Sequence, residues 1–374
     1  MKGFFSGKVL TLVMISLIIL LAGGLYFFYE LNNQNPTEDK EPTALVATSP
    51  TEVVDPPLSS ESRLSMLVEK YSNLGLTDVH NHDANGSYLG MLKIWERTAV
   101  KRVVLFGSVS EPAAIFTDAV AWAAYKTNPE LFVPFFSGFD LHNKSSLDVV
   151  RSNLEKGYMG LGEIVAASTQ SPIVSKVRWK AKDPMDGYLP QIYELCAEYK
   201  APILLHIDPP SGSPIQKLEE ALTTYPDTTF IFGHINAFNS PKAVEALMKE
   251  HPNLYADFFA GFTELSAGSA YTLEDFIPLI RQFPDRFLLS TDSGYGLESE
   301  EAAIESMYSL IDLLEDPVLA RKVAHDNFAA LIEAVPATKT QLEAIAVLEN
   351  ESGRKLNIDN SLTKLEAGKI LADN

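Results

Sequence analysis

The sequence predicts an α/β protein built on a closed (β/α)8 barrel, with an N-terminal transmembrane helix and a small C-terminal helical appendage. Short apolar runs rich in β-forming residues alternate with amphipathic segments, and eight such pairs occupy about 260 residues. Strands that alternate with helices form parallel βαβ units. The alternative, an open doubly wound sheet, usually has fewer strands and often a glycine-rich phosphate loop, but no GxGxxG pattern follows these runs.

The predicted barrel occupies residues 62–336. Its strands are short runs with β-branched and aromatic residues, expected at 76–82, 102–107, 132–139, 160–165, 203–208, 229–235, 254–259 and 287–292. Its helices repeat apolar residues at intervals of three and four, expected at 91–100, 113–126, 147–156, 188–199, 215–225, 241–249, 273–282 and 299–314. After the barrel, residues 337–374 predict an appendage of two helices, with Thr338 and Thr363 as N-caps and Glu366 completing a capping box.

The N-terminal segment predicts a membrane anchor. Residues 9–29 are almost entirely apolar, and about 20 such residues cross a bilayer as a helix. The lysines of the preceding stub, residues 1–8, place that stub in the cytoplasm, so the barrel is expected outside it, at the cell surface or in the periplasm. Cleavage near Ala22 is the alternative and would release a secreted protein. Residues 30–61, rich in Pro, Thr, Ser and acids, predict a flexible linker.

Charge and cysteine content narrow the function classes. The formal net charge is -19, which disfavours a nucleic-acid partner because phosphate backbones are repelled. The one cysteine, Cys196, lies in an apolar-periodic stretch and predicts a buried thiol in the core. No nucleic-acid partner is therefore expected.

Potential metal ligands recur where the predicted strands end. His80 and His82 share one face of the first strand because side chains alternate with period two. Catalytic groups of a (β/α)8 barrel gather at the carboxyl ends of its strands. The other candidates at such ends are Glu163, His206, His234 and Asp292. Any one of them could be an ordinary buried polar residue or a helix cap, but their common placement predicts a metal site. Nitrogen and oxygen ligands without thiolate suit Zn²⁺ first, with Mn²⁺ or Fe²⁺ as alternatives.

Other polar residues near these positions have less specific interpretations. Asp83, Asp208 and Asn236 neighbour the candidate ligands and could orient metal-bound imidazoles. Asp257 ends the seventh strand and could line the barrel mouth or belong to a barrel layer. In the loop after the fourth strand, Arg178 and Trp179 are candidates for substrate binding, since loops at this end contact substrates.

These motifs resemble the amidohydrolase superfamily of metal-dependent (β/α)8 hydrolases, and most closely the branch that also contains decarboxylases and lactonases. The resemblance extends over about residues 64–336 and rests on these motifs: Asp78-Val79-His80-Asn81-His82, Gly162-Glu163, His206, Gly233-His234 and Thr291-Asp292-Ser293. The chain departs from many relatives in two places. Ile235-Asn236-Ala237 follows the sixth-strand histidine in place of a glycine-rich run, and Glu163 stands where others have a lysine.

The resemblance implies a hydrolase that uses metal-activated hydroxide to cleave an amide, lactone or ester bond of a small-molecule substrate. With two metal ions, His80, His82 and Asp292 hold one, His206 and His234 hold the other, and Glu163 bridges them. With one ion, His206 joins the first group and His234 polarises the substrate carbonyl. In both arrangements Asp292 transfers protons, so Asp292 and His234 are the expected catalytic residues. The alternatives are a metal-dependent decarboxylase on the same barrel and a non-catalytic, membrane-tethered binding protein.

Overall fold

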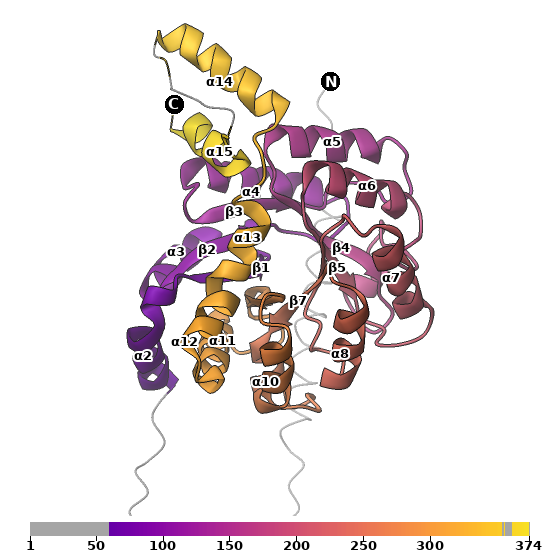
Figure 1. Cartoon of the computed structure of the whole chain (residues 1–374), viewed down its shortest axis with the longest axis vertical. Coiled ribbons are helices and arrows are strands. Elements are labelled where there is room, and N and C mark those ends of the chain that lie inside the picture. Colours follow the sequence, from indigo (N-terminus) through magenta and orange to yellow (C-terminus); the bar gives the residue numbers. More distant parts are fainter. Residues whose placement is uncertain (1–59, 354, 356–360, 374) are drawn as a thin grey trace, which may run out of the picture. The chain divides into compact units, whose positions relative to one another are not determined.

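Eight parallel strands form one sheet in chain order, as the sequence predicts (Figure 1). The computed structural model describes residues 60–353, 355 and 361–373. The strands are β1 (Leu76–Asn81), β2 (Val100–Leu105), β3 (Phe132–Phe136), β4 (Gly160–Ala167), β5 (Ile203–Ile207), β6 (Phe230–Phe232), β7 (Leu254–Phe259) and β8 (Phe287–Ser290). Each strand pairs in parallel with the next, from β1–β2 to β7–β8.

The last strand returns to the first, and this curves the sheet into a barrel. Asp78 of β1 accepts hydrogen bonds from the backbone nitrogen of Thr291 at 3.0 Å and from its hydroxyl at 2.6 Å. Beside it, the backbone nitrogen of His82 donates to Ser293 Oγ at 2.8 Å. These bonds join the residues just beyond β8 to β1, so the carboxyl ends of the two strands lie side by side.

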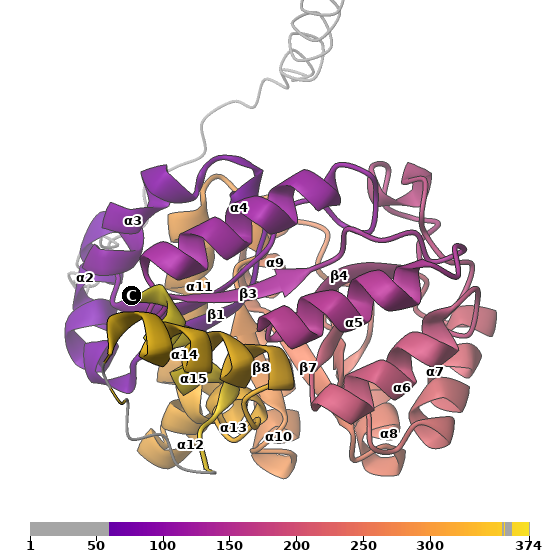
Figure 2. The same ribbon diagram turned by 90° about the horizontal axis from the view of Figure 1, so that it is seen from above.

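Helices connect the strands and cover the outside of the sheet (Figure 2). The connecting helices are α3 (Tyr88–Arg97), α4 (Ala114–Thr127), α5 (Ser146–Lys156), α6 (Leu189–Tyr199), α7 (Ser213–Thr224), α8 (Pro241–Glu250), α10 (Leu273–Gln282) and α11 (Glu300–Leu314). Shorter or flanking helices are α2 (Ser60–Tyr71), η1 (Ser72–Leu74), η2 (Asp83–Asn85), η3 (Val174–Lys176), α9 (Ala260–Leu265), η4 (Asp292–Gly294), α12 (Pro317–Arg321), η5 (Lys322–Asp326) and α13 (Asn327–Ile332).

The strands are buried on both faces, since helices cover the outside and side chains fill the inside. Every residue of β3 and of β4 is buried. Gly160 of β4 has no side chain because a Cβ at this position would overlap the ring of Phe135 on β3. Cys196 of α6 is buried in the same core, and burial raises the pKa of its thiol, as expected for a structural cysteine.

Several predicted strands extend too far at their carboxyl ends. The sixth was expected at 229–235, but β6 ends at Phe232; the eighth was expected at 287–292, but β8 ends at Ser290. The physical reason is the backbone beyond each end: His234 has φ of 35° and Asp292 has φ of 45°, values that no extended strand adopts. The candidate ligands of these two strands therefore lie just outside the sheet.

The C-terminal appendage forms the two predicted helices, α14 (Lys339–Ser352) and α15 (Lys364–Ala372). Both begin with a capping box: Thr338 with Gln341, and Thr363 with Glu366. Helix α14 contacts α5, α15 contacts α4, and the hydroxyl of Thr338 donates to the carbonyl of Glu155. The appendage therefore packs on the outer wall of the barrel.

Helix α15 carries a buried lysine whose removal is expected to stabilise the protein. Lys364 is 1% exposed, and its Nζ has no hydrogen-bond partner among the described residues. Burial lowers the pKa of Lys364 to about 7, whereas an unfolded lysine titrates near 10.5. Between these values the unfolded chain binds more protons than the folded one, so the free energy of unfolding rises with pH. Below pH 7 the buried charge costs most, since each unit of pKa shift corresponds to about 1.4 kcal/mol.

We therefore expect Lys364→Met to raise the free energy of unfolding by a few kcal/mol at pH 6, with an advantage that shrinks towards pH 10. Denaturant titrations at a series of pH values measure this difference. Lys339→Met is the matched control, since Lys339 lies on α14 with its side chain 83% exposed. Equal effects of the two substitutions at every pH would contradict the prediction.

The predicted anchor at 9–29 lies outside the described residues, as does the linker up to residue 59; both stay predictions. Within the described ranges, no helix has the length and apolar character needed to span a bilayer.

Candidate metal centre

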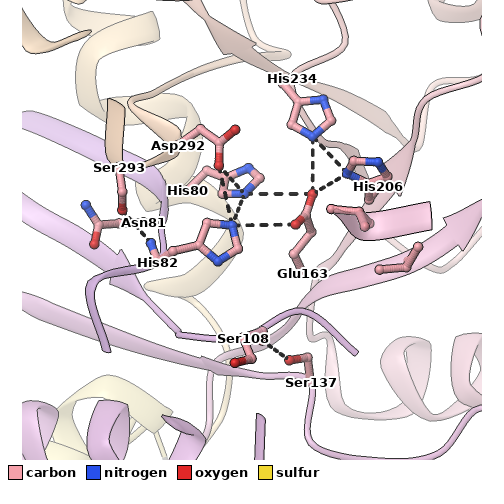
Figure 3. Close-up of polar contacts among 12 residues, drawn as sticks. His80, Asn81, His82, Ser108, Ser137, Glu163, His206, His234, Asp292 and Ser293 are labelled. Carbon is pink, nitrogen blue, oxygen red and sulfur yellow. Dashed lines mark hydrogen bonds and ion pairs between the residues drawn. The ribbon is translucent and has the colours of Figure 1, made fainter. Parts of the chain in front are cut away.

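Six predicted ligands from five strands lie together at the carboxyl ends of the barrel (Figure 3). They are His80 within β1, His82 directly after β1, Glu163 in β4, His206 in β5, His234 after β6 and Asp292 after β8. The barrel closure accounts for the arrangement, because strands distant in sequence direct their last residues into one space.

Two groups of donor atoms, each able to hold a metal ion, share the carboxylate of Glu163. In the first group, Nε2 of His82 lies 3.5 Å from Glu163 Oε2, and Nε2 of His80 lies 3.9 Å from Oε1. In the second group, Oε1 of Glu163 lies 2.9 Å from His206 Nδ1 and 3.2 Å from His234 Nε2. Glu163 therefore lies between two pairs of imidazoles.

Asp292 faces the first group. Its Oδ1 atom lies 3.4 Å from Nε2 of His80 and 3.4 Å from Nε2 of His82. The side chain also lines the cavity above the site, so it can reach a substrate as well as an ion.

Hydrogen bonds define which nitrogen of each first-group imidazole is free. Nδ1 of His80 lies 2.7 Å from Asp257 Oδ2, and Nδ1 of His82 faces the carbonyl oxygen of Gly107. Both partners only accept hydrogen bonds, so a neutral imidazole here carries its proton on Nδ1. The two Nε2 atoms are then bare acceptors 3.0 Å apart. Their lone pairs repel unless a cation lies between them, so this donor set fits a divalent metal ion.

The second group shows the same arrangement with the ring atoms exchanged. Nε2 of His206 lies 3.4 Å from Asp208 Oδ2, which leaves Nδ1 directed at Glu163. That Nδ1 atom is 3.1 Å from Nε2 of His234. Asp208 therefore orients His206 in the way Asp257 orients His80, by accepting the proton on the far side of the ring.

The local field favours positive charge among these nitrogens. Burial by itself lowers the pKa of His82, but the carboxylates of Asp292 and Glu163 outweigh it and hold this pKa well above the ordinary value. Burial by itself raises the pKa of Glu163, but His206 and His80 outweigh it and hold that pKa well below the usual range. Protons or metal ions can supply this charge, and a divalent ion supplies it with the geometry that the donor atoms already have.

Two of the six residues have a strained backbone. His234 and Asp292 have φ of 35° and 45°, in a region that residues other than glycine rarely adopt. Hydrogen bonds hold both: the backbone nitrogen of His234 donates to Asp257 at 2.9 Å, and the carbonyl of Asp292 accepts from Tyr295 at 2.9 Å. Backbone strain of this kind concentrates at functional sites.

A cavity of about 780 Å³ lies over the candidate centre, within the size range of small-molecule sites. Of the six ligands, His82, Glu163, His206, His234 and Asp292 line it. His80 is fully buried. Five candidate ligands are thus in reach of a bound molecule.

Arg178 and Trp179, the predicted substrate contacts, lie just beyond the part of their loop that lines this cavity. The lining segment runs from Gln170 to Val177, whereas Arg178 and Trp179 are not among the described lining residues. Asp208 positions the start of the loop by accepting hydrogen bonds from three successive backbone nitrogens of residues 169–171. A role for Arg178 and Trp179 in substrate binding stays a prediction.

The neighbouring polar residues differ in what they contact. Asp257 has a larger role than its sequence position indicates, because its Oδ2 atom binds both His80 and His234. Asn236 holds the backbone of Phe259 at the end of β7, and Asp83 accepts from the hydroxyl of Ser87. The available signal for Asp257 was its position at a strand end, which it shares with the ligands.

We expect Asp257→Asn to weaken metal binding about 10- to 100-fold, the usual effect of removing a carboxylate that orients a metal-bound histidine. The amide keeps the shape but loses the charge that holds the proton on His80 Nδ1. Competition with a chelator of known affinity measures the change, and circular dichroism verifies folding. Asp227→Asn is the control, since Asp227 is exposed in the loop before β6. Unchanged metal affinity in Asp257→Asn would contradict the assignment.

Comparison with known proteins agrees with this geometry. The family model described as amidohydrolase matches residues 164–333. The match contains His206, His234 and Asp292, while His80, His82 and Glu163 precede it. No curated protein matches the chain. Residues 164–333, just under half of the chain, thus match the amidohydrolase family, and the eight-stranded barrel and the His/Glu cluster agree with that match.

The solved structures that match this chain share little sequence with it. An uncharacterized TIM-barrel protein from Bordetella bronchiseptica has 16% identity and a TM-score of 0.48, over 68% of this chain and 97% of the other. A dihydroxybenzoic acid decarboxylase from Polaromonas sp. JS666, with bound manganese and 2-nitroresorcinol, has 13% identity and a TM-score of 0.46, over 69% and 96%. A lactonase from Listeria monocytogenes has 16% identity and a TM-score of 0.40, over 73% and 86%.

Proposed function

We propose that this protein is a metal-dependent hydrolase that cleaves an amide, lactone or ester bond of a small molecule. The proposal rests on the position of Glu163, whose carboxylate lies between two pairs of imidazoles. Asp292 faces one of these pairs and also lines the cavity. A carboxylate shared in this way, beside a second one that reaches the substrate, suits the activation of water.

In the proposed arrangement, His80, His82 and Asp292 would hold one ion, His206 and His234 would hold a second, and Glu163 would contribute to both sites. Zn²⁺ is the first candidate, since the donors are imidazole and carboxylate groups, with Mn²⁺ or Fe²⁺ as alternatives. A bound ion supplies Lewis acidity and makes water acidic enough to lose a proton near neutral pH.

The side chains have separate tasks in the proposed reaction. Asp292 accepts the proton of the attacking water and passes it to the leaving group, a role that fits a carboxylate that lines the cavity and lies 3.4 Å from the Nε2 atoms of His80 and His82. In a one-ion arrangement, His234, which faces the cavity, stabilises the negative charge that develops on the carbonyl oxygen. Asp257 and Asp208 keep the imidazoles in the required tautomers.

Metal analysis and product analysis test the proposal together. The purified full-length protein should contain stoichiometric divalent metal, lose turnover of an ester, lactone or amide panel on chelation, and regain it when metal returns. Release of carbon dioxide from aromatic acids without hydrolysis of the panel would instead support a decarboxylase. Absence of bound metal would support a non-catalytic binding protein.

We also propose that the barrel works outside the cytoplasm, tethered to the membrane by residues 9–29. The apolar segment after a lysine-containing stub and the linker that follows it support this location. Membrane fractionation with protease added from outside the cell tests it. Protection of the barrel from protease in intact cells would contradict it, and recovery in the medium would indicate cleavage of the segment.

A further inference from the structure

The walls of the cavity over the metal centre are apolar, in contrast to the ionisable groups at the centre itself. One wall belongs to the loop after β4 and includes Ile173, Val174 and Val177. The loop after β6 supplies Phe238, and helix α9, which directly follows β7, supplies Phe262. Concave apolar walls around a few convergent polar groups are typical of sites for small organic molecules.

The phenyl groups on the β6 and β7 side form a continuous patch. The ring centroids of Phe238 and Phe262 are 6.2 Å apart, and those of Phe259 and Phe262 are 6.4 Å apart. Phe259 is buried, so the patch is anchored in the core and extends outward to the cavity rim. A planar or alkyl group placed on it would meet side chains that the fold already holds in position.

Three large side chains that line the cavity are exposed, and no described part of the chain covers them. The exposed fractions are 63% for Ile173, 39% for Phe238 and 51% for Tyr295. Isolated exposed apolar residues are common, but a group of them around one cavity indicates a surface that an apolar ligand covers.

We propose that the active site accepts substrates with a bulky, uncharged alkyl or aryl substituent, which packs between Ile173 and Val174 on one side and Phe238 and Phe262 on the other. The inference rests on the proposed function for the bond that is cleaved, and adds the class of group attached to that bond.

The charges of the lining favour an uncharged substituent. Apart from the candidate metal ligands, the charged residues among the described lining are Glu111 and Lys176, which have opposite signs. Lys176 is exposed and Glu111 is half-buried, so neither forms an enclosed site for a counter-ion. An anionic or cationic tail would gain little from them because exposed ion pairs contribute little.

Straight-chain hydroxamic acids test the proposal, because their constant head group binds divalent metal while the alkyl chain varies. Calorimetric titration of the metal-loaded full-length protein, from acetohydroxamic to octanohydroxamic acid, gives a dissociation constant for each length. Burial of each added methylene on the walls should lower this constant by up to about fourfold. A dissociation constant independent of chain length would overturn the proposal.

Substitutions in the cavity walls show which residues contact the alkyl chain. Ile173→Ser and Phe238→Ser should each flatten the dependence on chain length, with a smaller loss of affinity for acetohydroxamic acid than for octanohydroxamic acid. Phe116→Ser is the matched control, since Phe116 is 72% exposed on α4 but does not line the cavity. If affinity increased with chain length equally in the wall variants and in the unsubstituted protein, the assignment of these walls would be overturned.

Two further series of ligands, carboxylate-ended chains and n-alkanols, separate this inference from its alternatives. Chains that end in a carboxylate should bind more weakly; tighter binding that Lys176→Met abolishes would overturn the proposal in favour of an anionic substituent. The n-alkanols need no metal, so their affinity should still increase with length if the metal centre proves absent. Loss of hydroxamate binding with retained alkanol dependence would therefore contradict the proposed function alone.

Discussion

Replacing Glu163 by alanine should lower turnover by at least about 10³-fold, because the Lewis-acid contribution of bound metal amounts to several kcal/mol. Glu163 is the carboxylate common to both donor groups, and its Oε1 lies 2.9 Å from His206 and 3.2 Å from His234. Its loss also removes the carboxylate that lies between the two pairs of imidazoles, of which His80, His206 and His234 are buried. Steady-state kinetics and metal content, measured on the same preparation, test both effects.

Glu111→Ala is the matched control for Glu163→Ala. Glu111 lines the same cavity but makes none of the imidazole contacts described for Glu163. The Glu111→Ala variant should keep full metal content and nearly full turnover. If Glu163→Ala retained both, Glu163 would not be a metal ligand. If it lost about half of the metal and most of the turnover, the two-ion arrangement would be favoured over the one-ion arrangement.

Replacing Asp292 by asparagine should lower kcat by about 10²- to 10⁴-fold, the usual contribution of a general acid or base. The amide keeps an oxygen near His80 and His82 but cannot accept a proton from water. We expect KM to change less than kcat, since the cavity walls that bind the substrate are untouched. The substitution also places a residue that tolerates positive φ at a position where φ is 45°.

Glu298→Gln controls for charge in the same loop. Glu298 is exposed and lies six residues after Asp292, so its loss should leave kcat and metal content unchanged. If Asp292→Asn kept full turnover, Asp292 would not transfer the proton. If it lost metal in proportion to turnover, the role of Asp292 would be limited to ligation.

Local sequence signals were sufficient for the order and type of the main elements. The eight strands and the two capped helices of the appendage follow from hydrophobic periodicity and from capping residues such as Thr338 and Thr363, which act over a few residues. The placement of histidines and acids at strand ends followed from the same signals, because parallel strands of a barrel all end at one face.

Contacts between distant residues decided the rest of the site. His80 and Asp257 are 177 residues apart, and their hydrogen bond exists only because β7 and β1 belong to one closed barrel. No local pattern distinguishes Asp257 from a barrel-layer carboxylate, or shows that Glu163 lies between the two imidazole pairs. The loop after β4 also depends on distant contacts. Hydrogen bonds to Asp208 position its start, and residues 170–174, 176 and 177, rather than Arg178 and Trp179, line the cavity.

Hydrophobic periodicity and the placement of polar residues at strand ends are local signals, so they predict the barrel and the six side chains at its mouth. The free nitrogen of each imidazole, the carboxylates that orient the rings and the loop residues that form the walls become known only from the folded protein. These properties depend on distances between strands and loops, and such distances arise only when the last strand closes against the first.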